Sequence, residues 1–516
     1  MYIEPKRGSI RHKAQKITTR PVPPPIGGLN TRDPLSAMEP TDAIVLDNFT
    51  PMAGKVQLRP GRAAYATGIS GLYTETLMTY ASPSATKLFA AAETVIWDVS
   101  TTGAATSSLT SLTNGRWEWV QFTIPSASYL ACVNNSADGM RYYNGTAWAT
   151  ATLTGTIDAT KLASISSHMN RIWLVEDESL DIYYLGLQAI QGAATKLETS
   201  SQFTKGGKVM AVATWTRDGG AGMDDVLASI TSRGEVLIYA GTDPDDPATW
   251  SKVGLFSIPR PISRRCAIKF GGDVCILTVQ GLIPMSEVLQ RADSNQAAVA
   301  ITDKIGPSIA DAAVLFGENF GWQVIEYPRR NLLLINVPVT ERATSYQYVM
   351  NTKTGAWGRW KALNAGCWGL SGDTIYLGLS DGTVSSLDDI NDDEGEPIDA
   401  LVVQAYNTYG DASRKRWVRY QPQMSKPKTY RPLVDVLMNF SPEIPDYTAP
   451  AAVASGWEWD ITDWDDLEWG PENASTFDWL SIRGHGVAGA LVLCVSGETA
   501  IEYNGGLVAY EAGGVY

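Results

Sequence analysis

The stretch that decides the fold is Lys87-Leu88-Phe89-Ala90-Ala91-Ala92, which is followed after Glu93 by Thr94-Val95-Ile96-Trp97-Asp98-Val99. Each run is short and apolar, and a polar residue separates the two. This is typical of consecutive strands joined by a tight turn. Similar runs follow at residues 129–133, 140–143, 171–175, 181–185, 234–239, 274–278, 331–337 and 374–378.

Turn residues and spacing indicate how these strands are arranged. Asp138-Gly139 and Asn144-Gly145 lie between apolar runs, and such pairs tolerate the positive φ of a hairpin. Strand pairs recur roughly every 35 to 50 residues, which is the length of one four-stranded propeller blade. The sequence therefore predicts a mainly β fold whose body, residues 49–395, is β-propeller-like. An array of β-sandwiches would give a similar pattern.

Composition limits the class of protein. The chain has 516 residues, a formal net charge of −14, and 17 Trp and 22 Tyr against 10 Phe. Rings with a polar atom suit half-buried positions and subunit contacts. The acidic balance argues against a generic nucleic-acid binder. No apolar run approaches the ~20 residues of a membrane span, and the basic N-terminus lacks the apolar core of a signal peptide.

Residues 1–48 are predicted to form an extended N-terminal arm and not a folded domain. Prolines at positions 21, 23, 24 and 25 favour a polyproline-like path. We expect the arm to become ordered on a neighbouring subunit or ring; a disordered tail is the alternative. The residues expected to bind this partner are the basic ones: Lys6, Arg7, Arg11, Lys13, Lys16 and Arg20.

Two segments later in the chain carry further structural expectations. Residues 294–315 are the best helical candidate, an insertion in the body that Pro307 should split into two short helices. Residues 388–397 are acidic and turn-prone; we expect a solvated loop, with a calcium site as the alternative. A basic strand follows at 414–419, where alternation places Lys415, Trp417 and Arg419 on one face. Its expected partners are the chain's own acidic segments, or alternatively phosphate.

Residues 396–516 are predicted to be a C-terminal β region, either separate from the body or packed back on it. Between Trp457 and Trp469 aromatic rings alternate with acids. Strand alternation accounts for this pattern, with rings on one face and acids in solvent. A carbohydrate platform with paired carboxylates is the alternative.

Signatures of catalysis and metal binding are missing from the sequence. The histidines, His12, His168 and His485, are too far apart in the chain for a metal cage, and His168 is expected in a core or turn role. There is no GxSxG, HExxH, P-loop or Rossmann glycine motif. We therefore expect no enzyme activity, metal or cofactor, although an acid pair in a propeller mouth would leave no mark in the sequence. The five scattered cysteines are expected to be small apolar core residues: Cys132, Cys266, Cys275, Cys367 and Cys494.

Three groups of segments carry a family resemblance. The first runs from Pro25-Ile26-Gly27-Gly28-Leu29-Asn30-Thr31-Arg32-Asp33-Pro34 through residues 42–49 to Leu58-Arg59-Pro60-Gly61. The second is residues 239–244 with Thr249-Trp250, and the third is residues 326–331 with 350–357. In this order they resemble the tail nozzle (tail tubular B-like) proteins of short-tailed bacteriophages, the podoviruses. The Gly27-Gly28 step is expected to be a flexible hinge between arm and body.

The resemblance implies a structural virion protein assembled in the host cytoplasm. Nozzle subunits form a hexameric ring of propeller-like subunits below the head-to-tail adaptor ring. The ring extends the DNA channel, retains packaged DNA without reading its sequence, and contacts tail fibres, spikes or a needle. A tail appendage that binds or degrades host polysaccharide is the competing interpretation, and a cytosolic propeller scaffold is a third.

Overall fold

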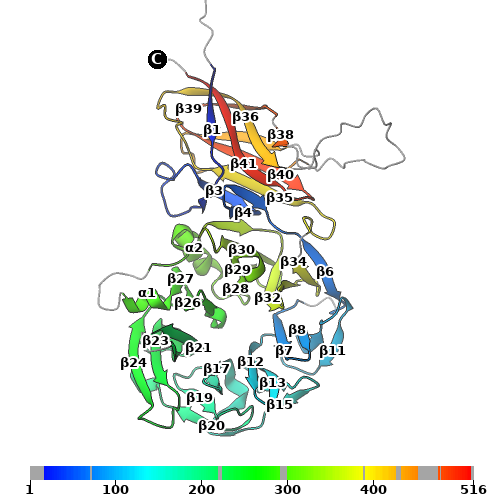
Figure 1. The fold of residues 1–516 in the computed structure, drawn as a ribbon, viewed down its shortest axis with the longest axis vertical. Coiled ribbons are helices and arrows are strands. Elements are labelled where there is room, and N and C mark those ends of the chain that lie inside the picture. Colours follow the sequence, from blue (N-terminus) through cyan, green and yellow to red (C-terminus); the bar gives the residue numbers. More distant parts are fainter. Residues whose placement is uncertain are drawn as a thin grey trace, which may run out of the picture.

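The computed structural model describes residues 17–69, 73–218, 223–290, 299–387, 390–425, 432–450, 475–476 and 478–512. It consists of a β-propeller and a second β domain (Figure 1). Of the eight sheets in this part of the chain, seven contain a propeller blade. The predicted mainly β, propeller-like fold is confirmed.

The first four blades follow the predicted strand runs closely. The first contains β6 (Arg62–Thr67), β10 (Gly103–Ala104), β32 (Ala365–Ser371), β33 (Thr374–Leu379) and β34 (Val384–Leu387). The second contains β7 (Thr76–Ala81), β8 (Thr86–Ala92), β9 (Val95–Asp98) and β11 (Thr106–Leu109). The third contains β12 (Glu118–Ile124), β13 (Ala127–Val133), β14 (Arg141–Tyr143) and β15 (Trp148–Thr150). The fourth contains β16 (Leu153–Gly155), β17 (Leu162–His168), β18 (Arg171–Glu176), β19 (Ile182–Leu185) and β20 (Gly192–Leu197).

The remaining three blades complete the ring. The fifth contains β21 (Val209–Asp218), β22 (Met223–Thr231), β23 (Glu235–Gly241) and β24 (Trp250–Ser257). The sixth contains β25 (Ala267–Phe270), β26 (Asp273–Thr278) and β27 (Gly281–Pro284). The seventh contains β28 (Gln323–Tyr327), β29 (Leu332–Thr340), β30 (Thr344–Asn351) and β31 (Trp357–Trp360). Because β6 pairs with β34, a strand from the start of the propeller and three from its end share one blade and close the circle.

The innermost strands are arranged in a ring (Figure 1). Each of them contacts the next around the ring, in the order β7, β12, β17, β21, β25, β28 and β32, and β32 contacts β7. Apolar side chains fill the space between neighbouring blades. Phe89, from the stretch quoted first, lies edge-on to Tyr143 and Trp148 of the third blade, with ring centroids 4.9 and 5.1 Å away. Blade-to-blade packing of this kind holds the ring together.

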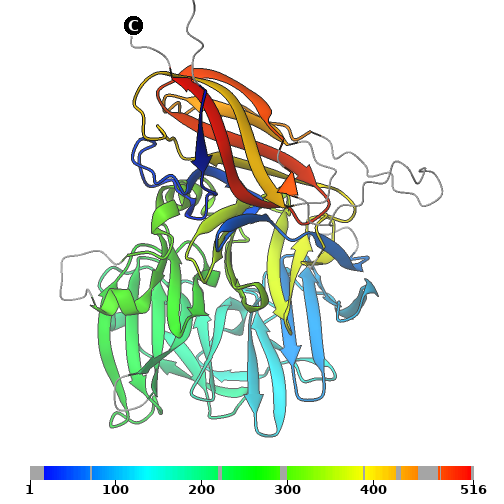
Figure 2. The same cartoon turned by 45° about the horizontal axis from the view of Figure 1, so that its top comes forward.

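The second domain packs two sheets face to face. One contains β1 (Ile17–Val22), β4 (Phe49–Met52), β5 (Lys55–Leu58), β36 (Lys415–Ser425), β38 (Ser475–Thr476), β39 (Leu480–Gly486) and β41 (Glu502–Ala512). The other contains β2 (Gly28–Leu29), β3 (Asp42–Asp47), β35 (Ile398–Gln404), β37 (Leu433–Met438) and β40 (Gly489–Gly497), and continues into the seventh blade. Buried residues of both sheets, such as Tyr420, Tyr503, Val402 and Leu493, share one core. Figure 2 shows this domain on one side of the propeller.

The domain boundaries differ from the prediction. Residues 17–47 are not a free arm, because β1 pairs with β41 and β3 pairs with β35 in the same chain. The propeller begins at β6 and ends at β34, so β4 and β5, assigned to the body, belong to the second domain. Pairing with strands more than 350 residues away organises the N-terminal segment, and local composition does not show such partners.

The predicted hinge at Gly27-Gly28 is a packed turn. Gly28 has φ +78° and is buried, and a Cβ atom there would lie 2.5 Å from the carbonyl oxygen of Trp357. Glycine is needed at this position for close contact between the second domain and the seventh blade, and not for flexibility. Residues 350–357 connect β30 and β31 as a hairpin, with Gly355 at φ +71° in the turn.

The described helices are short. They are α1 (Met285–Gln290), α2 (Gly306–Phe316) and the 3-10 turns η1 (Ala159–Lys161), η2 (Ser200–Gln202), η3 (Arg264–Cys266), η4 (Asp303–Ile305) and η5 (Pro328–Arg330). In the insertion predicted at 294–315, Pro307 lies in the first turn of α2 and starts the helix, where its missing N–H costs nothing. Residues 299–302 are not helical, so the prediction of a helix before Pro307 is wrong for these residues. Residues 294–298 lie outside the described residues. No described helix is long and apolar enough to cross a membrane.

The basic strand at 414–419 departs from simple alternation. Lys415 and Trp417 are buried on one face of β36, as predicted, but Arg419 is exposed. A β-bulge between Trp417 and Arg419 shifts the register and turns Arg419 outward. Arg416 pairs with Glu511 at 3.2 Å, an acidic residue of the same chain as expected.

Two further expectations can be compared with the structure. The acidic segment is not wholly solvated: Asp393 accepts hydrogen bonds from both terminal nitrogens of Arg59, a fully buried side chain. The five cysteines are buried and free, as predicted. The alternating Trp and acid residues 457–469 lie outside the described residues.

Candidate functional site

The central channel of the propeller is a concave feature that residues of all seven blades line. A cavity of about 360 Å³ is lined by residues of all the innermost strands, among them Thr76, Val120, Ser166, Thr214 and Gln323. A second cavity of about 380 Å³ lies where residues 114–118, 134–135, 262–265 and 317–322 meet. Arg264, Arg265 and Glu118 line both cavities, so the second is one mouth of the channel. The default position of a ligand site is a concave region of this kind.

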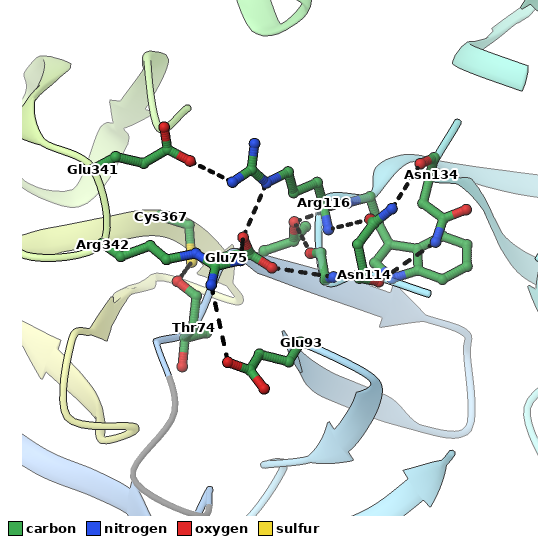
Figure 3. Close-up of polar contacts among 12 residues, drawn as sticks. Thr74, Glu75, Glu93, Asn114, Arg116, Asn134, Glu341, Arg342 and Cys367 are labelled. Atoms are coloured by element: carbon green, nitrogen blue, oxygen red, sulfur yellow. Dashed lines mark hydrogen bonds and ion pairs between the residues drawn. The ribbon is translucent and has the colours of Figure 1, made fainter. Parts of the chain in front are cut away.

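A buried carboxylate organises the mouth (Figure 3). Glu75 directly precedes β7, and its side chain is 1% exposed. It accepts hydrogen bonds from Arg116 Nε and Arg342 Nη2, each at 3.0 Å, and from the backbone N–H of Gly115 at 3.1 Å. Arg116 also pairs with Glu341. Because a buried charge is costly unless paired, this network fixes Glu75 between two guanidinium groups.

Arg265 bridges the channel at this mouth. It belongs to η3 at the start of the sixth blade, yet its side chain reaches the second and third blades. Its guanidinium donates to Glu118 Oε1 at 3.0 Å, to Thr76 Oγ1 at 2.7 Å and to the carbonyl oxygen of Trp117 at 2.9 Å. A contact across the ring of this kind ties together blades that are not neighbours.

An aromatic ring packs against two of the arginines at the mouth. Phe320, in the loop between α2 and β28, has Arg116 Cζ 4.7 Å and Arg265 Cζ 4.8 Å from its ring centroid. Cation–π attraction acts on both guanidinium groups. The charged mouth, defined as Glu75, Arg116, Glu118, Arg265 and Phe320, is therefore lined by side chains that pair with one another.

The same alternation of charge continues beside the fourth and fifth blades. Asp177 pairs with Lys208 at 2.9 Å and also with Arg264. Burial tends to raise the pKa of Asp177, but Lys208 and Arg264 outweigh it and the pKa is lowered. At Arg116, burial alone would lower the pKa, and the hydrogen bond to Glu75 raises it overall. Both groups therefore stay charged at neutral pH.

This arrangement is suited to holding the ring closed. The carboxylates of Glu75 and Glu118 are each bonded to guanidinium groups that have further partners. A general base or nucleophile needs a lone pair directed at a substrate, and these lone pairs are directed at arginines. Among the described residues, no group of three or more His, Cys, Asp or Glu side chains could hold a metal ion.

The residues predicted to bind a partner do not gather at this mouth. Lys6, Arg7, Arg11, Lys13 and Lys16 lie outside the described residues. Arg20 lies in β1 of the second domain, opposite Val508 of β41. The charged mouth was not predicted from the sequence. The one sequence feature that marks it is the pair Arg264-Arg265 directly before an innermost strand, and the partners of these two arginines come from other blades.

Comparisons with known proteins do not identify a family for the chain. No protein-family model matches the chain, and no curated protein sequence matches it. Similar solved structures include BBS1N in complex with ARL6DN, soaked with lead, at 11% identity and a TM-score of 0.41, covering 64% of this chain and 98% of that one. Another is virginiamycin B lyase from Staphylococcus aureus, at 12% identity and a TM-score of 0.37, covering 64% of this chain and 98% of that one.

Proposed function

We propose that this protein is a structural subunit of the tail nozzle of a short-tailed bacteriophage and has no enzyme activity. In this role it would form a hexameric ring below the adaptor ring, extend the DNA channel, retain packaged DNA and open for ejection. The resemblance of segments between residues 25 and 357 to nozzle proteins supports this choice of family. The observation that supports a structural over a catalytic role is the charged mouth, where the charged side chains that line the channel entrance are paired with one another.

The dimensions of the channel bear on the route of the DNA. A cavity of about 360 Å³ has the volume of roughly a dozen water molecules at about 30 Å³ each. A DNA duplex, whose major groove alone is about 12 Å wide, does not fit inside one propeller. In a nozzle the DNA would therefore pass along the axis of the ring, between subunits.

The net charge of the chain is consistent with DNA passing along the axis of the ring. Six copies of a chain of net charge −14 would carry −84. Acidic side chains facing the axis would repel phosphate and keep DNA from adhering during ejection. A hexamer whose axial surface is basic would contradict this part of the proposal.

The test is the mass of the purified protein, alone and mixed with its neighbouring ring protein, by light scattering and negative-stain imaging. Six-fold rings, with or without that partner, are the expected result. A trimer or monomer that depolymerises host polysaccharide would overturn the proposal and favour the tail-appendage alternative. Its carboxylates would then be sought near Trp459 and Trp464.

A further inference from the structure

Helix α2 carries an exposed apolar pair. Val314 is 85% exposed and Leu315 70% exposed, the two highest exposed fractions among the large hydrophobic side chains of the described chain. The other face of the helix is anchored, because Ile309, Ala312 and Ala313 are buried against β27 and β29. Val314 and Leu315 therefore project from a rigidly seated helix, where water contact with both side chains is unfavourable.

Two acids flank this pair. Asp311 and Glu318 are exposed and lie three residues before Val314 and three residues after Leu315. Positions three and four apart share one helical face, and Gly317 continues the helical backbone angles past the last turn. No ion-pair partner of either carboxylate is found in the described ranges. The α2 stripe, defined as Asp311, Val314, Leu315 and Glu318, thus reads acid, apolar, apolar, acid.

A matching segment exists in the same chain. Within residues 1–16, Arg7 and Arg11 bracket Ile10, and further cations follow at Lys13 and Lys16. Seven residues of helix separate the two acids by about 10 Å. Arg7 and Arg11, four residues apart, span up to about 13 Å if extended, so both can reach a carboxylate while Ile10 lies over the apolar pair.

The direction of β1 indicates which copy receives the segment. β1 pairs with the last part of β41, and Ile17 lies opposite Glu511, whereas the first residues of β41 pair with β5 near the propeller. Residue 17 is thus at the end of the second domain remote from the propeller, and α2 lies beside the junction of the two domains (Figure 1). From Val22 to Ile17, β1 thus runs away from the α2 stripe of its own chain.

From this geometry we propose that residues 1–16 of one copy bind the α2 stripe of a neighbouring copy. The proposal rests on the proposed function, which brings copies of the chain together in a ring. It names the surface that the basic segment recognises: an apolar pair between two carboxylates. Ile10 is buried on Val314 and Leu315, and Arg7 and Arg11 pair with Asp311 and Glu318.

The first experiment measures binding of a labelled peptide of residues 1–16 to the full chain carrying R7E and R11E, which disable its own segment. Adding V314S and L315S to that chain should weaken peptide binding at least tenfold, and so should D311K with E318K. The charge-reversal test uses a chain with D311K and E318K that keeps its own Arg7 and Arg11, since that segment no longer matches the stripe. A peptide with R7E and R11E should bind this chain. The control is L187S, which removes another exposed apolar side chain elsewhere (61% exposed) and should leave binding unchanged. Peptide binding that ignores the α2 substitutions would overturn the proposal.

The second experiment separates contact between copies from contact within one chain. Light scattering of the unmodified chain should give a multimer that V314S/L315S reduces to smaller species, with an unchanged melting temperature. If the unmodified chain is a monomer although the peptide binds α2, the segment folds back on its own helix and the proposal is wrong.

Failure of this proposal differs from failure of the nozzle function. Rings that form and bind the adaptor ring despite V314S/L315S would overturn the α2 contact and leave the nozzle. A multimer that needs the α2 stripe but does not bind the adaptor ring would overturn the nozzle and leave the contact.

Discussion

At the residue scale, His168 is the clearest buried titratable group in the propeller. It ends β17 with 2% exposure and lies beside the rings of Trp173 and Trp250, with centroids 6.3 and 6.2 Å away. Nδ1 is 3.3 Å from the hydroxyl of Thr214, and Nε2 has no hydrogen-bond partner among the described residues. Burial, aided by Lys269 and opposed by Asp225, lowers the pKa of His168 to about 4.

The stability of the fold should therefore depend on pH through this side chain. Because the folded pKa is about 4 and the unfolded pKa about 6.5, the unfolded chain binds the proton first as the pH falls. The contribution is fully present above about pH 6.5 and decreases towards pH 4, by up to about 3 kcal/mol. Urea unfolding at pH 7.5 and 4.5 should show a smaller difference in H168Q than in the parent chain. The exposed His485 gives the control H485Q; an equal change in both variants would contradict the assignment.

Glu75 allows a second prediction at this scale. Replacing it with Gln leaves Arg116 and Arg342 without their shared carboxylate at a buried position. Both arginines are partly exposed, at 37% and 45%. We therefore expect the free energy of unfolding to fall by about 2 kcal/mol, which is less than the cost of breaking a fully buried pair. Glu178, 79% exposed, is the control: E178Q should change the free energy of unfolding by less than about 0.5 kcal/mol. Equal effects would show that the network at the mouth contributes little.

At the scale of single elements, Gly28 and Gly54 form a matched pair. Both have φ +78°, but a Cβ at Gly28 would lie 2.5 Å from the Trp357 oxygen, whereas nothing lies within 4 Å at Gly54. G54A should lower the free energy of unfolding by about 1 kcal/mol, because alanine disfavours the positive φ. G28A should cost at least about 2 kcal/mol more, because β2 must move away from β31. Thermal and urea unfolding of both variants check this, and equal losses would mean that the contact relaxes freely.

The bulge in β36 shows why element patterns fail locally. Alternation correctly places Lys415 and Trp417 inward, but one shifted residue turns Arg419 to solvent. The ammonium of Lys415 is buried against the carbonyl oxygens of Ser413 and Val487 at 3.1 and 3.0 Å. A strand's period is encoded locally, whereas a bulge depends on the two strands that pair with it.

At the scale of the whole molecule, Arg265 should contribute to keeping the ring closed. In R265A the sixth blade loses its hydrogen bonds to Thr76, Glu118 and Trp117. Amide hydrogen exchange should then become faster in β7 and β12, with little change in β40 and β41 of the second domain. R265K is the matched control: its single ammonium cannot make all of these bonds, so we expect an intermediate effect. Uniform acceleration in both domains would indicate general destabilisation.

The sequence by itself determined the strand-rich character and most hairpin positions, and its blade-length spacing favoured a propeller, although an array of β-sandwiches would give a similar pattern. The runs of apolar residues, the Asn-Gly and Asp-Gly turns and the blade-length spacing are local signals, and strand pairs adjacent in the sequence satisfy them. The buried free cysteines followed for the same reason, since each lies in or directly beside an apolar run.

Only the tertiary structure decided which strands the N-terminal segment pairs with and which side chains line the mouth of the channel. The pairing of β1 with β41, the packed turn at Gly28 and the reach of Arg265 across the ring all join residues far apart in the sequence. An acidic residue before a strand, such as Glu75, has the same sequence pattern whether its side chain faces solvent or an arginine. Its role depends on burial and on the position of its partner, and both are set only in the closed ring.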